Sequence, residues 1–145
     1  MWSGFSGDKD IDKLEKVQRR FTKRLPALKH YTYFQRLNRL DLESLELRRL
    51  RQDLIFTYKL VFGLIDLNVH DFFRCSFEKV RHGHGYKLFL PTCHSSTCFN
   101  FFAHRVLRIW NVLPHDTRTD FSSLAGFKRS LNTNLLQKFL KVYFN

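Results

Sequence analysis

The spacing of apolar residues in the first part of the chain follows helical periodicity. Apolar side chains recur every three or four residues from Ile11 onward (Ile11, Leu14, Val17, Phe21, Leu25 and Leu28), which places them on one face of a helix. Pro26 disfavours helical backbone at the residue before it. The pattern therefore predicts a helix over residues 11–24 with a buried apolar stripe, preceded by a disordered N-terminal segment, 1–9.

The longest helical pattern follows Ser44, a residue type that caps helix N-termini. Leu47, Leu50, Leu54, Tyr58, Val61 and Ile65 trace one stripe, and from Leu54 onward apolar residues occur on all sides. That pattern is typical of an element buried on several faces, so this helix is predicted to be the centre of the fold. Shorter patterns predict helices over 33–40, within 104–114, and over 124–139 after Ser122 or Ser123.

Residues 71–100 lose the helical period and gain turn signals. Gly83, Gly85 and Pro91 indicate a loop, and a short hairpin is expected across Ser95 and Ser96. The predicted fold is therefore mainly α: a single small helical domain over 10–145, with about four to five helices and a short irregular or β-hairpin insertion near residues 80–100.

The net charge of the chain indicates which class of partner it binds. The chain has 25 Lys and Arg against 13 Asp and Glu, a formal net charge of +12, which favours a polyanion such as nucleic acid or an anionic membrane. No apolar run approaches the roughly 20 residues that a membrane-spanning helix needs. Three cysteines without a signal-like N-terminus indicate a reducing, intracellular location, in the nucleus or cytoplasm. Of the two polyanions, we expect nucleic acid.

Two cationic clusters are the candidates for phosphate contact. Residues 16–24 and 48–51 carry charges of one sign only, in a chain that is basic overall. The alternative is an ordinary surface helix with a solvated basic face. The candidate nucleic-acid-binding residues are Lys16, Arg19, Arg20, Lys23, Arg24, Arg48, Arg49 and Arg51.

Aromatic residues offer a second possible nucleic-acid contact. Phe101, Phe102 and Trp110 could stack on unpaired bases. Their helical spacing with Val106 and Ile109 favours a place in the core instead.

No catalytic constellation is present in the sequence. It has no phosphate-binding loop, no nucleophile elbow, no HExxH and no adjacent pair of aspartates that could hold catalytic magnesium. We therefore expect no catalytic residue, no cofactor and no small-molecule substrate.

A group of histidines and cysteines raises the question of zinc. His82, His84, Cys93, His94, Cys98 and His104 fall within 23 positions, and structural zinc takes four such ligands. The spacing of Cys93 and Cys98 lies at the edge of the usual range, and no second tight pair follows. A His-rich loop with packed cysteines is favoured, and metal binding by Cys93, His94, Cys98 and His104 stays open.

Five segments resemble a known family in order. They are "DIDKLEKVQRRFTKRLPAL", "LDLESLELRRLRQDLIFTYKLVFGL", "GHGYKL", "FFAHRVLRIWNVLP" and "SLAGFKRSL". Together they resemble the region immediately after the polymerase domain in reverse transcriptases of non-LTR (LINE-type) retrotransposons of the jockey and CR1-like groups. The resemblance covers nearly the whole chain. It departs at Asp41 and Glu43, where Gly and then Pro or Thr are usual, and at His82, where Arg is usual.

The resemblance implies a function without catalysis. The chain would be the C-terminal fragment of an RNA-directed DNA polymerase, binding RNA or DNA backbones beside the parent's polymerase domain. The family's catalytic aspartates belong to a palm motif that no position here matches, so the chain alone would not be an enzyme. The alternative is a structural helical module that packs on the missing polymerase thumb and makes no nucleic-acid contact. Its unpartnered apolar stripe would then make the isolated chain sticky or dimeric.

Overall fold

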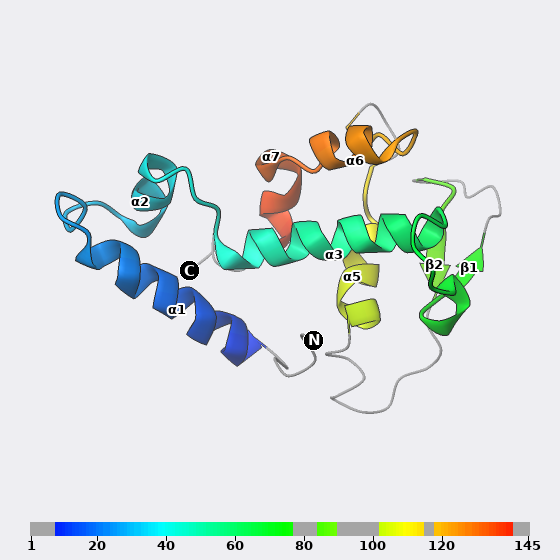
Figure 1. Ribbon diagram of the computed structural model, residues 1–145, viewed down its shortest axis with the longest axis horizontal. Helices are drawn as coiled ribbons and strands as arrows, with labels where there is room; N and C mark the ends of the chain where they lie inside the picture. Colours follow the sequence, from blue (N-terminus) through cyan, green and yellow to red (C-terminus); the bar gives the residue numbers. More distant parts are fainter. Residues whose placement is uncertain (1–7, 77–83, 90–101, 115–117, 141–145) are drawn as a thin grey trace.

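The computed structural model describes residues 8–76, 84–89, 102–114 and 118–140. In these ranges the chain has six α-helices and one two-stranded antiparallel sheet (Figure 1). The helices are α1 (Asp8–Arg24), α2 (Tyr33–Arg39), α3 (Leu45–Val61), α5 (Phe102–Trp110), α6 (Leu124–Ser130) and α7 (Thr133–Leu136), with 3-10 turns at Val69–Asp71 and Gln137–Phe139. The predicted mainly α class is confirmed. Residues 8 and 9, expected to be disordered, belong to α1.

Helix α3 is the centre of the fold, as predicted. Figure 1 shows α1 and α2 beside its N-terminal end, with α5 on one side and α6 and α7 on the other. Its stripe is buried at Leu47, Leu50, Leu54 and Tyr58. The predicted cap is also confirmed, because the Ser44 side chain accepts a hydrogen bond from the backbone N–H of Leu47 at 3.2 Å.

The C-terminus of α3 comes earlier than the apolar pattern predicts. The helix ends at Val61, and Gly63 has a φ of +65°. The backbone N–H of Leu64 donates to the Lys59 carbonyl at 2.8 Å, and that of Gly63 to the Leu60 carbonyl at 3.3 Å. This pair of bonds is the Schellman motif, which satisfies the last carbonyls and needs a left-handed residue.

The strand pair lies at the far end of α3. Strand β1 (Arg74–Ser76) pairs antiparallel with β2 (Lys87–Phe89), with Cys75 opposite Leu88. On the other edge of β2, the Asn111 side chain accepts from the Leu88 N–H at 3.0 Å and donates to its carbonyl at 2.7 Å. The hairpin expected across residues 95 and 96 falls outside the described residues.

The aromatic core confirms the assignment of Trp110 to the interior. Trp110 is fully buried, and its indole N–H donates to the Tyr86 carbonyl at 2.7 Å. His84 is also buried: its Nδ1 accepts from the Tyr86 N–H at 3.2 Å, so its Nε2 donates to the Trp110 carbonyl at 2.6 Å. Phe102 is half-buried against this core, and Phe101 lies outside the described residues.

The continuous C-terminal helix predicted over 124–139 is wrong. Helix α6 ends at Ser130, and α7 starts at Thr133 after Asn132. The Asn132 side chain accepts from the Leu135 N–H at 2.8 Å. Asparagine competes for backbone donors in this way, so it begins a new helix rather than continuing the old one.

Helix α1 packs on a different face from the one that the apolar pattern predicts. Val17 is 67% exposed and Phe21 is 62% exposed, so their predicted burial is wrong. The buried residues of α1 are Glu15 and Thr22 instead. The Thr22 hydroxyl donates to the Gln18 carbonyl at 2.9 Å. Helix α1 therefore docks through a polar face.

The contact that fixes this face is made by Glu15, which is only 2% exposed. One of its carboxylate oxygens accepts from the Tyr33 hydroxyl of α2, and the other accepts from the Glu46 N–H of α3 at 3.3 Å. Burial, and then the hydrogen bond to Glu15, raise the pKa of Tyr33 well above its usual range. We call these three groups the carboxylate clasp. It ties α1 to both neighbouring helices.

The conformation of Gly63 leads to a first prediction. Gly63→Ala should lower the free energy of unfolding by about 1 kcal/mol, because an L-residue is disfavoured in the left-handed region. Gly85→Ala is the matched control: both positions have open space for a Cβ, but only Gly63 has a positive φ. The control should be neutral or stabilise by up to about 1 kcal/mol. Equal losses in urea unfolding would contradict the assignment.

The carboxylate clasp leads to a second prediction. Glu15→Leu and Tyr33→Phe should each destabilise the fold, and a double-mutant cycle should give a coupling of about 1.5–3 kcal/mol, as for a hydrogen bond to a charged group. Tyr58→Phe is the control, because its hydroxyl donates to the distant Phe121 carbonyl. It should combine with Glu15→Leu additively to within about 0.5 kcal/mol. Additivity in both cycles, measured by chemical denaturation, would refute the clasp.

Candidate nucleic-acid interface

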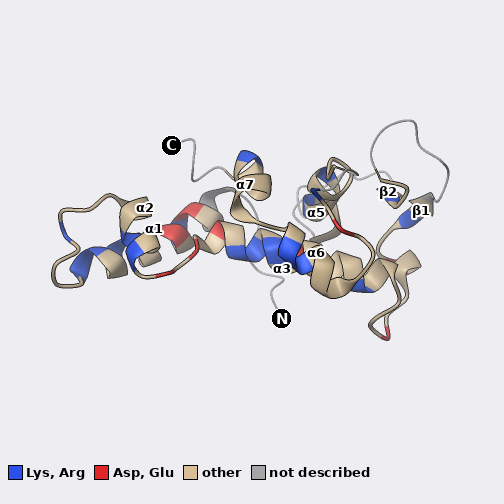
Figure 2. Ribbon diagram, turned by 90° about the horizontal axis from the view of Figure 1, so that it is seen from above, with Lys and Arg blue, Asp and Glu red and all other residues tan. Residues whose placement is uncertain are grey.

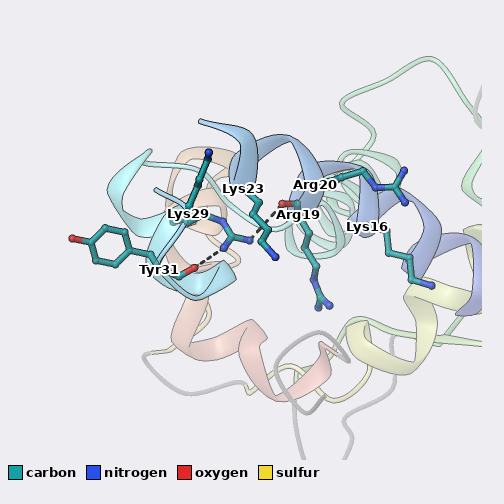
Figure 3. Close-up of a pocket in the computed structure, with 7 residues that line it drawn as sticks. Lys16, Arg19, Arg20, Lys23, Lys29 and Tyr31 are labelled. Atoms are coloured by element: carbon teal, nitrogen blue, oxygen red, sulfur yellow. Dashed lines mark hydrogen bonds between the residues drawn. The ribbon is translucent and has the colours of Figure 1, made fainter. Parts of the chain in front are cut away.

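An open hollow of about 420 Å³ lies against α1 and the loop that leads into α2 (Figure 3). Six of its seven lining residues are cationic, the seventh is a tyrosine, and none is a carboxylate. We call it the basic hollow. Its lining residues are Lys16, Arg19, Arg20, Lys23, Lys29, Tyr31 and Arg36.

Four of these residues lie on α1, and the helical periodicity determines the side of α1 to which each one points. At about 100° per residue, Lys16, Arg20 and Lys23 point to the side of α1 adjacent to the buried face that holds Glu15. Val17 and Phe21 point to a third side of α1, about 110° around the helix from the middle of these cations. Figure 3 shows the cationic side chains in a row along the helix. Lys23 follows Lys16 by seven positions, which is about 10 Å along the axis.

Arg36 of α2 forms the floor of the hollow and is only 6% exposed. Its Nε donates to the Thr22 hydroxyl at 3.1 Å, and its two terminal nitrogens donate to the carbonyls of Tyr31 at 2.5 Å and Arg19 at 3.4 Å. One guanidinium thereby joins α1, the loop and α2. It holds the walls together and adds its own positive charge beneath them.

The loop after α1 brings two residues that the sequence analysis missed. Ala27 has a φ of +65°, and the N–H of Leu28 donates to the Leu25 carbonyl at 3.2 Å. This turn reverses the chain, so that Lys29 and Tyr31 return to the cationic side of α1 (Figure 3). Pro26 signalled the end of the helix, but no sequence signal specified the direction of the return.

The hollow is arranged before any ligand binds. The Arg19 guanidinium carbon lies 5.0 Å from the centre of the Tyr33 ring, a cation–π contact. Tyr33 is in turn held by Glu15, so the clasp supports the inner wall of the hollow. Six like charges without a lining carboxylate repel one another, and a bound anion would relieve that repulsion.

Four of the eight predicted binding residues therefore share one site: Lys16, Arg19, Arg20 and Lys23. Arg24 and Arg48 are exposed, but neither lines the hollow. Figure 2 shows Lys and Arg, in blue, on several other helices as well, so positive charge alone does not distinguish this site.

Arg49 and Arg51, both on α3, are packed within the fold instead. The Arg51 Nε donates to the Leu131 carbonyl at 3.0 Å, which ties α3 to the end of α6. Arg49 is half-buried, and burial followed by the neighbouring Arg105 charge lowers its pKa. Arg105 itself pairs with Asp53, with its Nε 2.9 Å from the carboxylate. The structure does not bring Arg49 or Arg51 to the basic hollow.

A second hollow, of about 790 Å³, lies between α6 and α7 and has mixed charge. Asp120 lines it, and hydrogen bonds from Ser122 lower the pKa of that carboxylate and keep it ionised. A carboxylate in the wall weakens attraction for phosphates. Its lining residues are Arg118, Asp120, Gly126, Arg129, Ser130, Asn132, Asn134, Leu135 and Lys138.

The described residues contain no group of three or more His, Cys, Asp or Glu side chains that could hold a metal ion. His82, Cys93, His94 and Cys98 lie outside them, and His84 uses both ring nitrogens within the core. In the same part of the chain, no helix is long and apolar enough to cross a bilayer.

Comparison of the chain with known protein families, curated proteins and solved structures finds no match. The resemblance to retrotransposon reverse transcriptases therefore stays a prediction from the sequence. The case for a function rests on the geometry and charge of the basic hollow.

Proposed function

We propose that this chain binds the phosphodiester backbone of RNA or DNA through the basic hollow, without strong sequence preference. The observation that carries the proposal is the convergence of six cationic side chains on one hollow whose lining has no carboxylate. Phosphate oxygens accept charge-assisted hydrogen bonds from Arg and ion pairs from Lys. Contacts to phosphates carry no sequence information, which accounts for the tolerance.

The size of the cationic row matches a nucleic-acid backbone. The about 10 Å from Lys16 to Lys23 corresponds to about three phosphates of one strand counted along the axis of a duplex, at about 3.4 Å of axis per phosphate. Lys29 extends the row beyond the end of α1 (Figure 3). A polymer of phosphates can therefore meet several cations at once, whereas a single small anion would meet only some of them.

The sequence resemblance adds a biological setting to the proposal. In that setting the chain is the C-terminal, non-catalytic part of a non-LTR retrotransposon RNA-directed DNA polymerase. It acts inside the cell, in the nucleus or cytoplasm, next to the parent's polymerase domain. The basic hollow then helps to hold the RNA or DNA on which that domain works.

The exposure of Val17 and Phe21 supports a second candidate function, which is packing against another protein. Contiguous exposed apolar surface marks sites that pack on a partner, and these two side chains are four positions apart, so they are neighbours on the helix surface. This pair lies on the side of α1 away from the basic hollow, and would suit a structural module that packs on a polymerase thumb. In that case the chain needs no nucleic-acid contact of its own.

The salt dependence of binding separates the two functions. For the parent chain, log affinity for duplex DNA should fall with log salt between about 50 and 200 mM, because each neutralised phosphate releases counterions. Replacing Lys16, Arg20 and Lys23 by Gln should flatten the slope by about 0.9 for each phosphate that is no longer neutralised, or about 2–3 in all. Gln preserves helix propensity, so circular dichroism should be unchanged. Fluorescence anisotropy measures both affinity and slope.

A matched control removes three charges elsewhere. Arg24, Arg48 and Lys128 are exposed and do not line the hollow, so their replacement by Gln should leave most of the affinity and slope intact. Equal weakening by both triple variants would mean that net charge alone drives binding. An unaltered affinity in the hollow variant would favour the packing function.

The non-catalytic character of the chain is a further prediction. With magnesium, nucleotides and a primed template, the purified chain should show no primer extension. Phosphoryl transfer by two metal ions about 4 Å apart needs paired carboxylates, and the sequence has no adjacent aspartate pair. Template-dependent incorporation above a no-protein control would overturn this prediction.

A further inference from the structure

Tyr31 lies at the loop end of the basic hollow, and its backbone is fixed on both sides. Its N–H donates to the Leu28 carbonyl at 3.2 Å, and its carbonyl accepts from Arg36 at 2.5 Å. Figure 3 shows its ring beyond Lys29, directed away from the row of cations. The ring thus stands where a backbone that runs along the row would leave the hollow.

The ring of Tyr31 is not used by the core. Tyr33 and Tyr58 both pack against phenylalanine rings and donate their hydroxyls to protein acceptors. Within the described ranges, no aromatic ring packs on Tyr31 and its hydroxyl has no hydrogen-bond partner. The Arg39 guanidinium carbon lies 3.9 Å from the centre of the Tyr31 ring. This cation–π contact orients the ring and leaves it outside the core.

We propose that the basic hollow takes single-stranded nucleic acid, with phosphates on its cations and one base stacked on the ring of Tyr31. The inference rests on the proposed function, and it names the form of nucleic acid and the residue that selects it. Single-strand sites combine a cationic track with aromatic platforms, because every base has a π-face. A duplex keeps its bases stacked on one another, so it can use the cations but not the ring.

The test uses two ligands with the same backbone charge. One is a thymidine oligonucleotide of about twelve nucleotides, and the other is an abasic strand of equal length. The full chain should bind the thymidine strand about tenfold more tightly than the abasic strand, as expected for stacking of one base. Tyr31→Leu should remove this preference and leave binding of the abasic strand within about twofold. Tyr31→Phe keeps the ring, so the preference should survive.

A matched aromatic control separates this site from a general effect of exposed rings. Phe21→Leu removes a ring that is 62% exposed on the other side of α1, and it should not alter the preference. If both strands bind equally with a steep salt dependence, the role of Tyr31 is wrong while backbone binding stands. If neither strand binds in a salt-dependent way, the proposed function itself fails. A preference that persists in Tyr31→Leu would place the stacking elsewhere and overturn the inference.

Discussion

The buried carboxylate of Glu15 determines how the N-terminal part of the molecule is arranged. A charge taken out of water must find donors, because an unpaired buried carboxylate costs several kcal/mol or more. The Tyr33 hydroxyl and the Glu46 N–H are those donors. Once Glu15 faces inward, helix geometry places Lys16 and its companions beside the interface, and Val17 opposite it. The basic hollow is therefore a consequence of one hydrogen-bonded anion.

The two sides of α1 have different chemistry, and each corresponds to one of the candidate functions. One side holds cations without lining carboxylates, which suits a polyanion. The other holds an exposed valine and phenylalanine, which suit an apolar partner. Because the sides point in different directions, one chain could use both surfaces together. Neither surface is needed for the main core, which is built on α3.

Sequence reasoning succeeded where burial follows apolar periodicity. The stripe of α3, the cap at Ser44 and the burial of Trp110 were all predictable, because burial of large apolar groups dominates there. It failed for α1, since the apolar period takes no account of a buried acid that finds two donors far away in the sequence. Asn132 shows the same limit, because one side-chain hydrogen bond interrupted a regular apolar pattern.

The candidate site was predictable only in part, for a related reason. Lys16, Arg19, Arg20 and Lys23 share one helix, so their proximity follows from local geometry. Lys29, Tyr31 and Arg36 reach the hollow through a reversal of the chain at Ala27 and through long-range hydrogen bonds of a buried guanidinium. Such tertiary contacts leave no periodic signal in the sequence. Arg51 shows the same limit, because its hydrogen bond to the Leu131 carbonyl joins positions far apart in the chain and has no signal in the sequence.

The small apolar cluster of Tyr33 and Leu37 is separate from the main core on α3. Helices α1 and α2 therefore form a satellite unit, joined to the rest by polar links such as that from Gln18 to the Glu43 carbonyl at 3.0 Å. Units with few buried apolar contacts open at a lower free energy than the whole domain. A polyanion that bridges α1 and the following loop would bind only the closed unit, and would slow its amide hydrogen exchange in proportion to occupancy.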